Sequence, residues 1–247
     1  MLANRNLTTT TRRGLYFARL LHIKTVSTPN ENALKFVSTD GELLQDRGKP
    51  SVELRNTDDS LIKHSPLAQR IFAQCSGVES MMIGDDFVTI NKDEMVHWSQ
   101  ITGDMIDLLT QYLASGKAAL TPEFFSVQES DVGYDVNVPK FEYDEDQQEI
   151  SDMIAELIQT RIRPAIMDDG GDIQYRGYDP ELGTVYLKLQ GACKSCSSSE
   201  VTLKHGIESM LKHYIEEVEN VVQILDPEEQ IALKEFEKLE QKLGAQH

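Results

Sequence analysis

The chain has 247 residues, 40% hydrophobic and 26% charged, a composition typical of a globular protein with one large or two small domains. Its formal net charge is -17, and non-specific nucleic-acid binding needs a basic surface, so we expect no nucleic-acid partner. No apolar run approaches the roughly 18 residues of a membrane span, so we also expect no membrane-spanning segment.

The first 28 residues differ from the rest of the chain in charge. The first acidic residue is Glu31, and before it the segment is rich in threonine. Five basic residues precede it: Arg5, Arg12, Arg13, Arg19 and Lys24. This composition is typical of a mitochondrial targeting peptide, and the apolar core of a secretory signal is missing. We therefore expect residues 1–28 to be a targeting peptide, cut near residues 21–30, and the protein to lie in the mitochondrial matrix.

Residues 29–119 have the pattern of a compact α+β domain. A helix is predicted after Ser65, whose hydroxyl suits a cap, with Pro66 in the first helical position. A second helix is predicted over 98–115 from apolar residues at helical spacing, with Gly116 as its stop. Strands are predicted at 34–37, 78–83 and 87–90. No residue pattern in this domain indicates chemistry.

The rest of the chain divides into three parts. Residues 120–148 hold eight acidic side chains against one lysine, together with two prolines, and predict an acidic flexible linker. Residues 149–225 have the order helix, strand, strand, helix, strand. Residues 226–247 open with Asp-Pro-Glu-Glu, a helix start signal, and predict an amphipathic C-terminal helix. The expected fold class is therefore α+β, with two small α+β domains joined by an acidic linker.

The pattern that carries chemistry is Cys193-Lys194-Ser195-Cys196, between an alternating strand and the next helix. Two intervening residues let both sulfurs face one metal centre, and thiolates suit iron–sulfur clusters, zinc and copper(I). Free amides and the dipole at a helix start are expected to lower the pKa of such thiols. The chain has one more cysteine, Cys75, and this odd, small count suits a reducing compartment.

One cysteine pair offers two ligands, whereas a cubane cluster takes four. Two copies of the loop meeting at a twofold axis would supply four sulfurs, so a homodimer is expected. Two other interpretations use the same pair: a thiol–disulfide oxidoreductase, and a zinc ion shared across a dimer. The acidic and glycine-rich run 168–172 is interpreted as a turn and not as a hard-metal site.

These residues resemble a known family. The second block is similar to the NifU-like C-terminal domain of the Nfu iron–sulfur scaffold family. Its matching motifs are Arg163-Pro164, Asp169-Gly170-Gly171-Asp172, Gly191-Ala192-Cys193-x-x-Cys196-x-Ser198-Ser199 and Thr202-Leu203-Lys204-x-Gly206-Ile207-Glu208. The first block resembles the family's N-terminal domain through 32–36, 65–68 and 86–90. Together the resemblance covers about residues 29–225.

The resemblance implies a carrier and not an enzyme, with no catalytic residues. It implies a [4Fe-4S] cluster bridged between two protomers, held by Cys193 and Cys196, and passed to mitochondrial apoproteins. Client types associated with the family are lipoyl synthase, aconitase and succinate dehydrogenase. The tail after Leu225 is not part of the shared pattern. From the linker we expect the two domains to reorient independently, with the first assisting delivery and holding no cluster.

Overall fold

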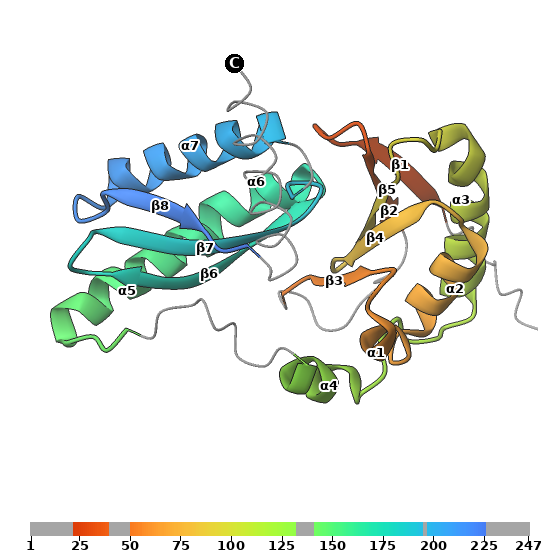
Figure 1. Ribbon diagram of the computed structural model, residues 1–247, viewed down its shortest axis with the longest axis horizontal. Helices are drawn as coiled ribbons and strands as arrows, with labels where there is room; N and C mark the ends of the chain where they lie inside the picture. The colour runs from red at the N-terminus through yellow and green to blue at the C-terminus, as the bar shows by residue number, and fades with distance from the viewer. Residues whose placement is uncertain (1–21, 40–49, 132–140, 195–196, 226–247) are drawn as a thin grey trace, which may run out of the picture.

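The computed structural model describes residues 22–39, 50–131, 141–194 and 197–225, without the side chains of 129–131 and 197–201. Over these ranges the chain forms two α+β domains that face one another (Figure 1), which confirms the expected fold class. Most of the expected targeting peptide, Cys196 and the expected C-terminal helix lie outside the described residues. No helix in the described ranges has the length and hydrophobicity needed to cross a bilayer.

Within the described residues, the first domain is a five-stranded antiparallel sheet covered on one face by helices (Figure 1). In spatial order its strands are β1 Ile23–Ser27, β2 Ala33–Ser38, β5 Phe87–Lys92, β4 Val78–Ile83 and β3 Val52–Arg55. Its helices are α1 Asp59–Ile62, α2 Pro66–Gln74, α3 Trp98–Ala114 and α4 Phe124–Asp131. The core lies between α2, α3 and the sheet, around Phe36, Leu67 and Leu109.

Local signals place the two main helices where the sequence predicts them. The Oγ of Ser65 accepts a hydrogen bond from the Ala68 amide at 3.2 Å, and Pro66 occupies the first turn of α2. Helix α3 ends just before Gly116, whose φ of +65° is a conformation that glycine adopts without strain. The short elements β1, β3, α1 and α4 were not predicted.

Strand β1 lies inside the segment 1–28 that the sequence assigns to a targeting peptide. It pairs with β2 along its whole length, from Ile23 opposite Ser38 to Ser27 opposite Leu34. The first domain therefore begins at Ile23, six residues before the expected boundary. The prediction failed because only Ile23 in this strand is buried, so the strand shows no alternation of apolar and polar residues.

The expected linker, 120–148, is largely folded. Leu120 and Phe124 are buried in the core of the first domain. At the other end, Asp144 caps the next helix by accepting a hydrogen bond from the Gln147 amide at 2.9 Å. The linker was predicted from its high count of acidic residues, and that count took no account of the two buried apolar residues or of the helix cap. Of the expected linker, residues 132–140 lie outside the described residues.

The second domain confirms the predicted order of helix, strand, strand, helix, strand. Its first helical segment is continuous through α5 Glu145–Leu157, a π-helical turn η1 Ile158–Ile162, and α6 Arg163–Asp168. The sheet and last helix are β6 Gly171–Asp179, β7 Thr184–Gly191, α7 Ser197–Tyr214 and β8 Asn220–Gln223. In the described residues β6 pairs antiparallel and β8 parallel with β7. The π-helical turn precedes Pro164, which has no amide proton to donate to an α-helical bond.

Candidate metal site

Cys193 lies in the turn that connects β7 to α7, residues 191–194, here called the cysteine turn. This turn stacks on a second one, residues 168–171 between α6 and β6, here called the glycine turn. The Ala192 amide donates to the Gly170 carbonyl at 3.3 Å, and Gly171 pairs with Gly191 at the end of the sheet. A Cβ at Gly171 would collide with the sulfur of Cys193, so a glycine here makes room for the thiol.

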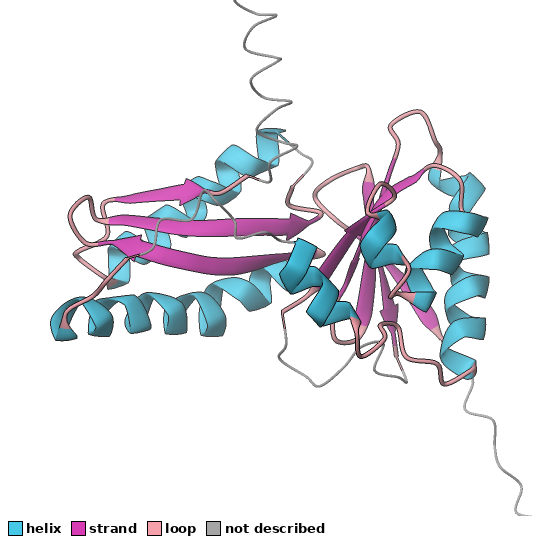
Figure 2. Cartoon of the chain, turned by 60° about the horizontal axis from the view of Figure 1, so that its bottom comes forward, coloured by secondary structure: helices cyan, strands magenta, loops and turns pink. Residues whose placement is uncertain are grey.

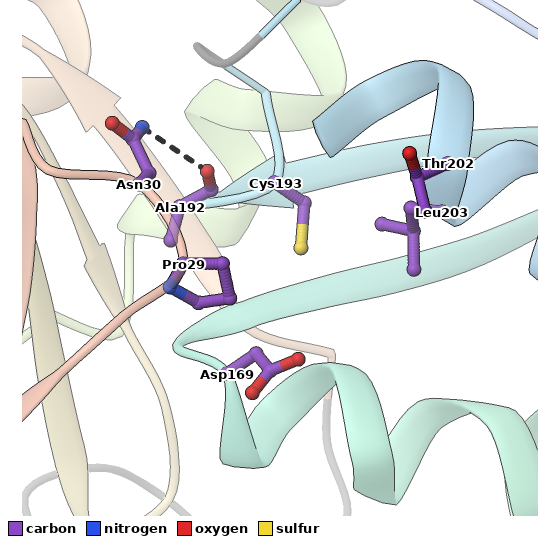
Figure 3. A pocket seen from close by; sticks show the side chains of 7 residues that line it. All are labelled: Pro29, Asn30, Asp169, Ala192, Cys193, Thr202 and Leu203. Atoms are coloured by element: carbon purple, nitrogen blue, oxygen red, sulfur yellow. Dashed lines mark hydrogen bonds between the residues drawn. The ribbon is translucent and has the colours of Figure 1, made fainter. Parts of the chain in front are cut away.

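Cys193 is 8% exposed, and its sulfur points into a cavity of about 450 Å³ (Figure 3). The cavity is lined by Pro29, Asn30, Asp169, Ala192, Cys193, Thr202 and Leu203. Pro29 and Asn30 belong to the first domain, and Asn30 donates from its Nδ2 to the Ala192 carbonyl at 3.2 Å. The candidate site is therefore built by both domains. No sequence pattern signals this contribution, because an asparagine is ordinary in a turn between strands.

Burial raises the pKa of the Cys193 thiol to about 12, and the negative charges of Asp169 and Asp172 act in the same direction. The sequence predicted a lowered pKa from a helix start. That prediction is wrong for this arrangement, because loss of water around the sulfur and two nearby carboxylates disfavour the thiolate. Cys193 also precedes the first residue of α7, Ser197, by four positions.

The structure places one of the two predicted ligands, since Cys196 lies outside the described residues. Cys75 is buried in the hydrophobic core of the first domain, whereas Cys193 packs in that of the second. The two described cysteines are both free thiols and are not brought together. Among the described residues, no group of three or more His, Cys, Asp or Glu side chains is arranged to hold a metal ion.

Asp172, just after the glycine turn, has a structural role. Its Oδ1 accepts from Arg163 Nε at 2.7 Å and from the Ile173 amide at 2.8 Å. Its Oδ2 accepts from Arg163 Nη2 at 3.0 Å and from the Ser51 amide of the first domain at 3.1 Å. Burial alone would raise the pKa of Asp172, but these donors outweigh it and hold the pKa below its ordinary value. The acidic run 168–172 is thus part of a turn that the hydrogen bonds of Asp172 hold in place.

Both halves of the chain match one protein family. The NifU-like domain profile matches residues 154–222, and the profile described as scaffold protein Nfu/NifU N terminal matches residues 23–116. The second match begins at the first residue of β1.

Relatives from two organisms are similar to most of the chain. It is 66% identical over 227 residues to the mitochondrial NifU-like protein of Saccharomyces cerevisiae, covering 91% of this chain and 89% of that one. It is 39% identical over 214 residues to the Homo sapiens protein named NFU1 iron-sulfur cluster scaffold homolog, mitochondrial, covering 85% of this chain and 74% of that one.

A solution structure of the NifU-like protein from Saccharomyces cerevisiae covers 49% of this chain and 97% of its own, with 56% identity and a TM-score of 0.40.

The yeast and human relatives are both named as mitochondrial, which agrees with the predicted organelle. A scaffold name denotes a carrier and agrees with the prediction that the protein is not an enzyme. By its two domain matches and its identity to these relatives, the chain belongs to the Nfu (NifU-like) family.

Proposed function

We propose that this protein is an iron–sulfur cluster carrier of the mitochondrial matrix. In this proposal two protomers hold one [4Fe-4S] cluster between them and pass it to apoproteins of the lipoyl synthase, aconitase and succinate dehydrogenase types. The observation that carries the proposal is the Cys193 thiol, aimed into a cavity from a turn that glycines keep free of side chains. The scaffold name of the human relative supports the same function.

The donor set fits a cluster as cargo. Cys193 offers a soft thiolate, and Cys196 provides the second one in the same four-residue motif. Ala192 and Leu203 give the cavity apolar walls, which suit the weakly hydrated sulfides of a cluster. Because a cubane takes four thiolates, a second copy of the chain completes the set. No cluster ligand is assigned to the first domain, whose one cysteine, Cys75, is buried in its core.

Transfer requires ligand exchange, in which a client thiolate replaces a carrier thiolate on the cluster. Each protomer holds only half of the ligands, so separating the protomers removes two of the four bonds together. A thiol–disulfide oxidoreductase is less compatible with the site. Such an enzyme needs a reactive thiolate at neutral pH in the metal-free protein, where burial raises the pKa of Cys193, whereas a cluster displaces the thiol proton when it binds.

The test is anaerobic reconstitution of the full chain, with iron and sulfide analysis and an absorption spectrum. We expect one cluster per two chains and a shift from monomer to dimer in size-exclusion chromatography. Cys193→Ser and Cys196→Ser should each abolish stable cluster binding, whereas Cys75→Ser, the matched control, should retain it. A colourless protein holding zinc or no metal would refute the carrier function. A complete cluster on a monomer would refute the bridged form.

A further inference from the structure

Four residues form a straight row across the first sheet. Lys35 on β2 lies opposite Thr89 on β5, Thr89 lies opposite Met82 on β4, and Met82 lies opposite Glu53 on β3. Neighbouring side chains in a strand point to opposite faces, and Phe36, next to Lys35, points into the core. The row therefore lies on the sheet face that carries no helix in the described chain. It has a cation at one end and an anion at the other.

The charged ends of this row hold the second domain. At one end, Lys35 Nζ donates to the Met167 carbonyl, just before the glycine turn, at 2.7 Å. At the other end, Glu53 Oε1 accepts from the Gly191 amide at 3.3 Å, and its Oε2 lies 3.3 Å from Lys194 Nζ. The cation of the row thus contacts the residue that precedes the glycine turn, and the anion contacts the cysteine turn.

The middle of the row lies directly under two glycines of the second domain. A Cβ at Gly170 would lie 3.2 Å from Thr89 Oγ1, and a Cβ at Gly191 would lie 2.8 Å from Met82 Sδ. Both glycines have a positive φ, +81° for Gly170 and +68° for Gly191. Their missing side chains let the backbone of the two turns rest on the sheet. In Figures 1 and 2, the end of the second sheet that carries the cysteine turn faces the first sheet.

The second domain buries the whole row. Lys35 is 9% exposed, Thr89 and Met82 are fully buried, and the Glu53 side chain is 9% exposed. The same contact brings Asn30 over the cysteine turn, where it lines the cavity of Cys193. A cluster held by two chains needs both cysteine turns in contact with it. Pro29 and Asn30 of the first domain line the cavity of Cys193, so the docked first domain occupies space beside the sulfur that a second turn would need.

We propose that the helix-free face of the first sheet is a binding surface for the chain's own cysteine turn, and that this docking competes with the cluster-bridged dimer. The competition rests on the proposed function, because it requires Cys193 to bind the cluster. Docking makes the empty monomer a stable alternative to the loaded dimer. When a client takes the cluster, the first domain covers the empty turn and opposes recapture of the cargo.

Several features of the contact oppose docking and favour its reversal. Burial raises the pKa of Glu53 and lowers the pKa of Lys35, so both charges are desolvated beyond what their partners offset. Among the described residues, the buried hydroxyls of Ser51 and Thr89 have no hydrogen-bond partner, which also disfavours the docked state. The nine residues 132–140 join the domains covalently, and such tethering raises the effective concentration of one domain at the other.

The first test measures access to Cys193 in the reduced, metal-free full chain. Two charge reversals in the row, Lys35→Glu and Glu53→Lys, should open the contact by repelling the acidic residues near the glycine turn and Lys194, respectively. Lys24→Glu and Glu79→Lys, at exposed positions of the same sheet, are matched controls. The readout is the rate of alkylation by iodoacetamide. Trypsin cuts after Lys194 and so separates Cys193 from Cys196 for mass spectrometry.

We expect several-fold faster alkylation of Cys193 in both row variants and no change in the two controls. The new charges act on the thiolate in opposite directions, since glutamate disfavours and lysine favours it. A faster alkylation of Cys193 in both row variants therefore reports that the contact between the domains has opened. Cys75, buried in the first core, reports unfolding and should stay unreactive. Equal Cys193 rates in wild type and both row variants would overturn the docking surface.

The second test is cluster reconstitution of the same five proteins. Both row variants should form the loaded dimer at lower iron and sulfide concentrations than wild type and the controls, and should release the cluster to an apoprotein more slowly. Faster Cys193 alkylation with unchanged dimer formation would overturn the competition while leaving the carrier function intact. If no protein of the set bound a cluster, the carrier function would fall, and the alkylation rates would still decide the docking.

Discussion

Two buried carboxylates lie beside the stacked turns, Asp172 in the second domain and Glu53 in the first. Asp172 accepts hydrogen bonds from Nε and Nη2 of Arg163 and from two backbone amides, at 2.7 to 3.1 Å. Glu53 has two contacts of 3.3 Å, to the Gly191 amide and to Lys194. The pKa of Asp172 lies below its ordinary value, whereas burial raises the pKa of Glu53 above its own.

The difference shows how the same chemical group can fix one contact and leave another releasable. A carboxylate with several short, charge-assisted bonds recovers the free energy lost on leaving water. A carboxylate with two long contacts recovers only part of it. Three of the four bonds of Asp172 stay within the second domain, so this residue belongs chiefly to the frame of that domain, and Glu53 belongs to a contact that can open. The predictions below test this contrast, beginning with the largest expected effect.

Asp172→Asn should destabilise the second domain by about 3–5 kcal/mol, because it leaves the Arg163 charge buried without its counter-ion. Urea unfolding followed by circular dichroism measures this loss. The single tryptophan, Trp98, lies in the first domain, so its fluorescence reports that domain separately. The fluorescence transition should be nearly unchanged. A variant as stable as wild type would remove Asp172 from the frame.

The same residue predicts an acid dependence. Since the folded pKa of Asp172 is lowered from an ordinary value of 3.8, its contribution to stability is complete above that pH and is lost as the pH falls through the lower, folded pKa. Wild type should therefore converge on Asp172→Asn in stability below about pH 3.8. A stability gap that stayed constant from pH 7 to pH 2.5 would contradict this assignment.

Gly170→Ala should have two smaller effects, a loss of stability and a separation of the two domains. A residue with a Cβ at a φ of +81° costs about 1–2 kcal/mol, and this Cβ would lie 2.9 Å from Thr28 Cγ2 in the other domain. Gly116→Ala is the matched control, since its φ is +65° and nothing lies within 4 Å of the added Cβ. Both variants should lose stability, but only Gly170→Ala should separate the domains, as measured by small-angle X-ray scattering. Separation in both would point to unfolding.

Glu53→Gln should have the smallest effect, a change of less than about 1 kcal/mol in the free energy of docking. The effect is small because Lys194 and Arg55 only partly offset the burial of the carboxylate. Its pKa is raised in the docked state, so docking takes up a proton and strengthens as the pH falls toward and through that pKa. Tumbling of the two domains, from nuclear spin relaxation between pH 7.5 and pH 5, should become more concerted. Glu53→Gln should abolish this dependence, and a wild type that loosened on acidification would reverse the sign.

Much of the fold follows from short-range patterns in the sequence. The serine cap and proline before α2, the helical spacing in α3 and the alternation in β7 all act between neighbouring residues. The position of Cys193 at the end of β7 was predictable for the same reason. The contact between domains was not predictable, because Lys35 and Glu53 are polar residues at alternate strand positions and look like a solvent-facing row. Only the packing of the second domain shows that they are buried.

The pKa of Cys193 was mispredicted for a related reason. A helix start after a cysteine is visible in the sequence, whereas the burial of its sulfur depends on Gly171, Asp169 and Asn30, which are distant along the chain or belong to another element. The linker prediction was wrong for a different reason. It relied on the count of acidic residues and overlooked two apolar residues, Leu120 and Phe124, that are buried in the first core. Predictions that depend on local spacing survived, and those that depend on tertiary burial did not.

The position of strand β1 links the predicted targeting-peptide cut to the risk of aggregation. It is the edge strand of the first sheet and covers the backbone of β2 from Leu34 to Ser38. A cut after Ser27 would strip it away and leave β2 with a row of unpaired amides and carbonyls, which is a template for pairing with other chains. A cut before Ile23 keeps the edge short and mostly polar. Processing at the predicted cut, within residues 21–30, would therefore decide whether the mature chain stays soluble or self-associates through this sheet.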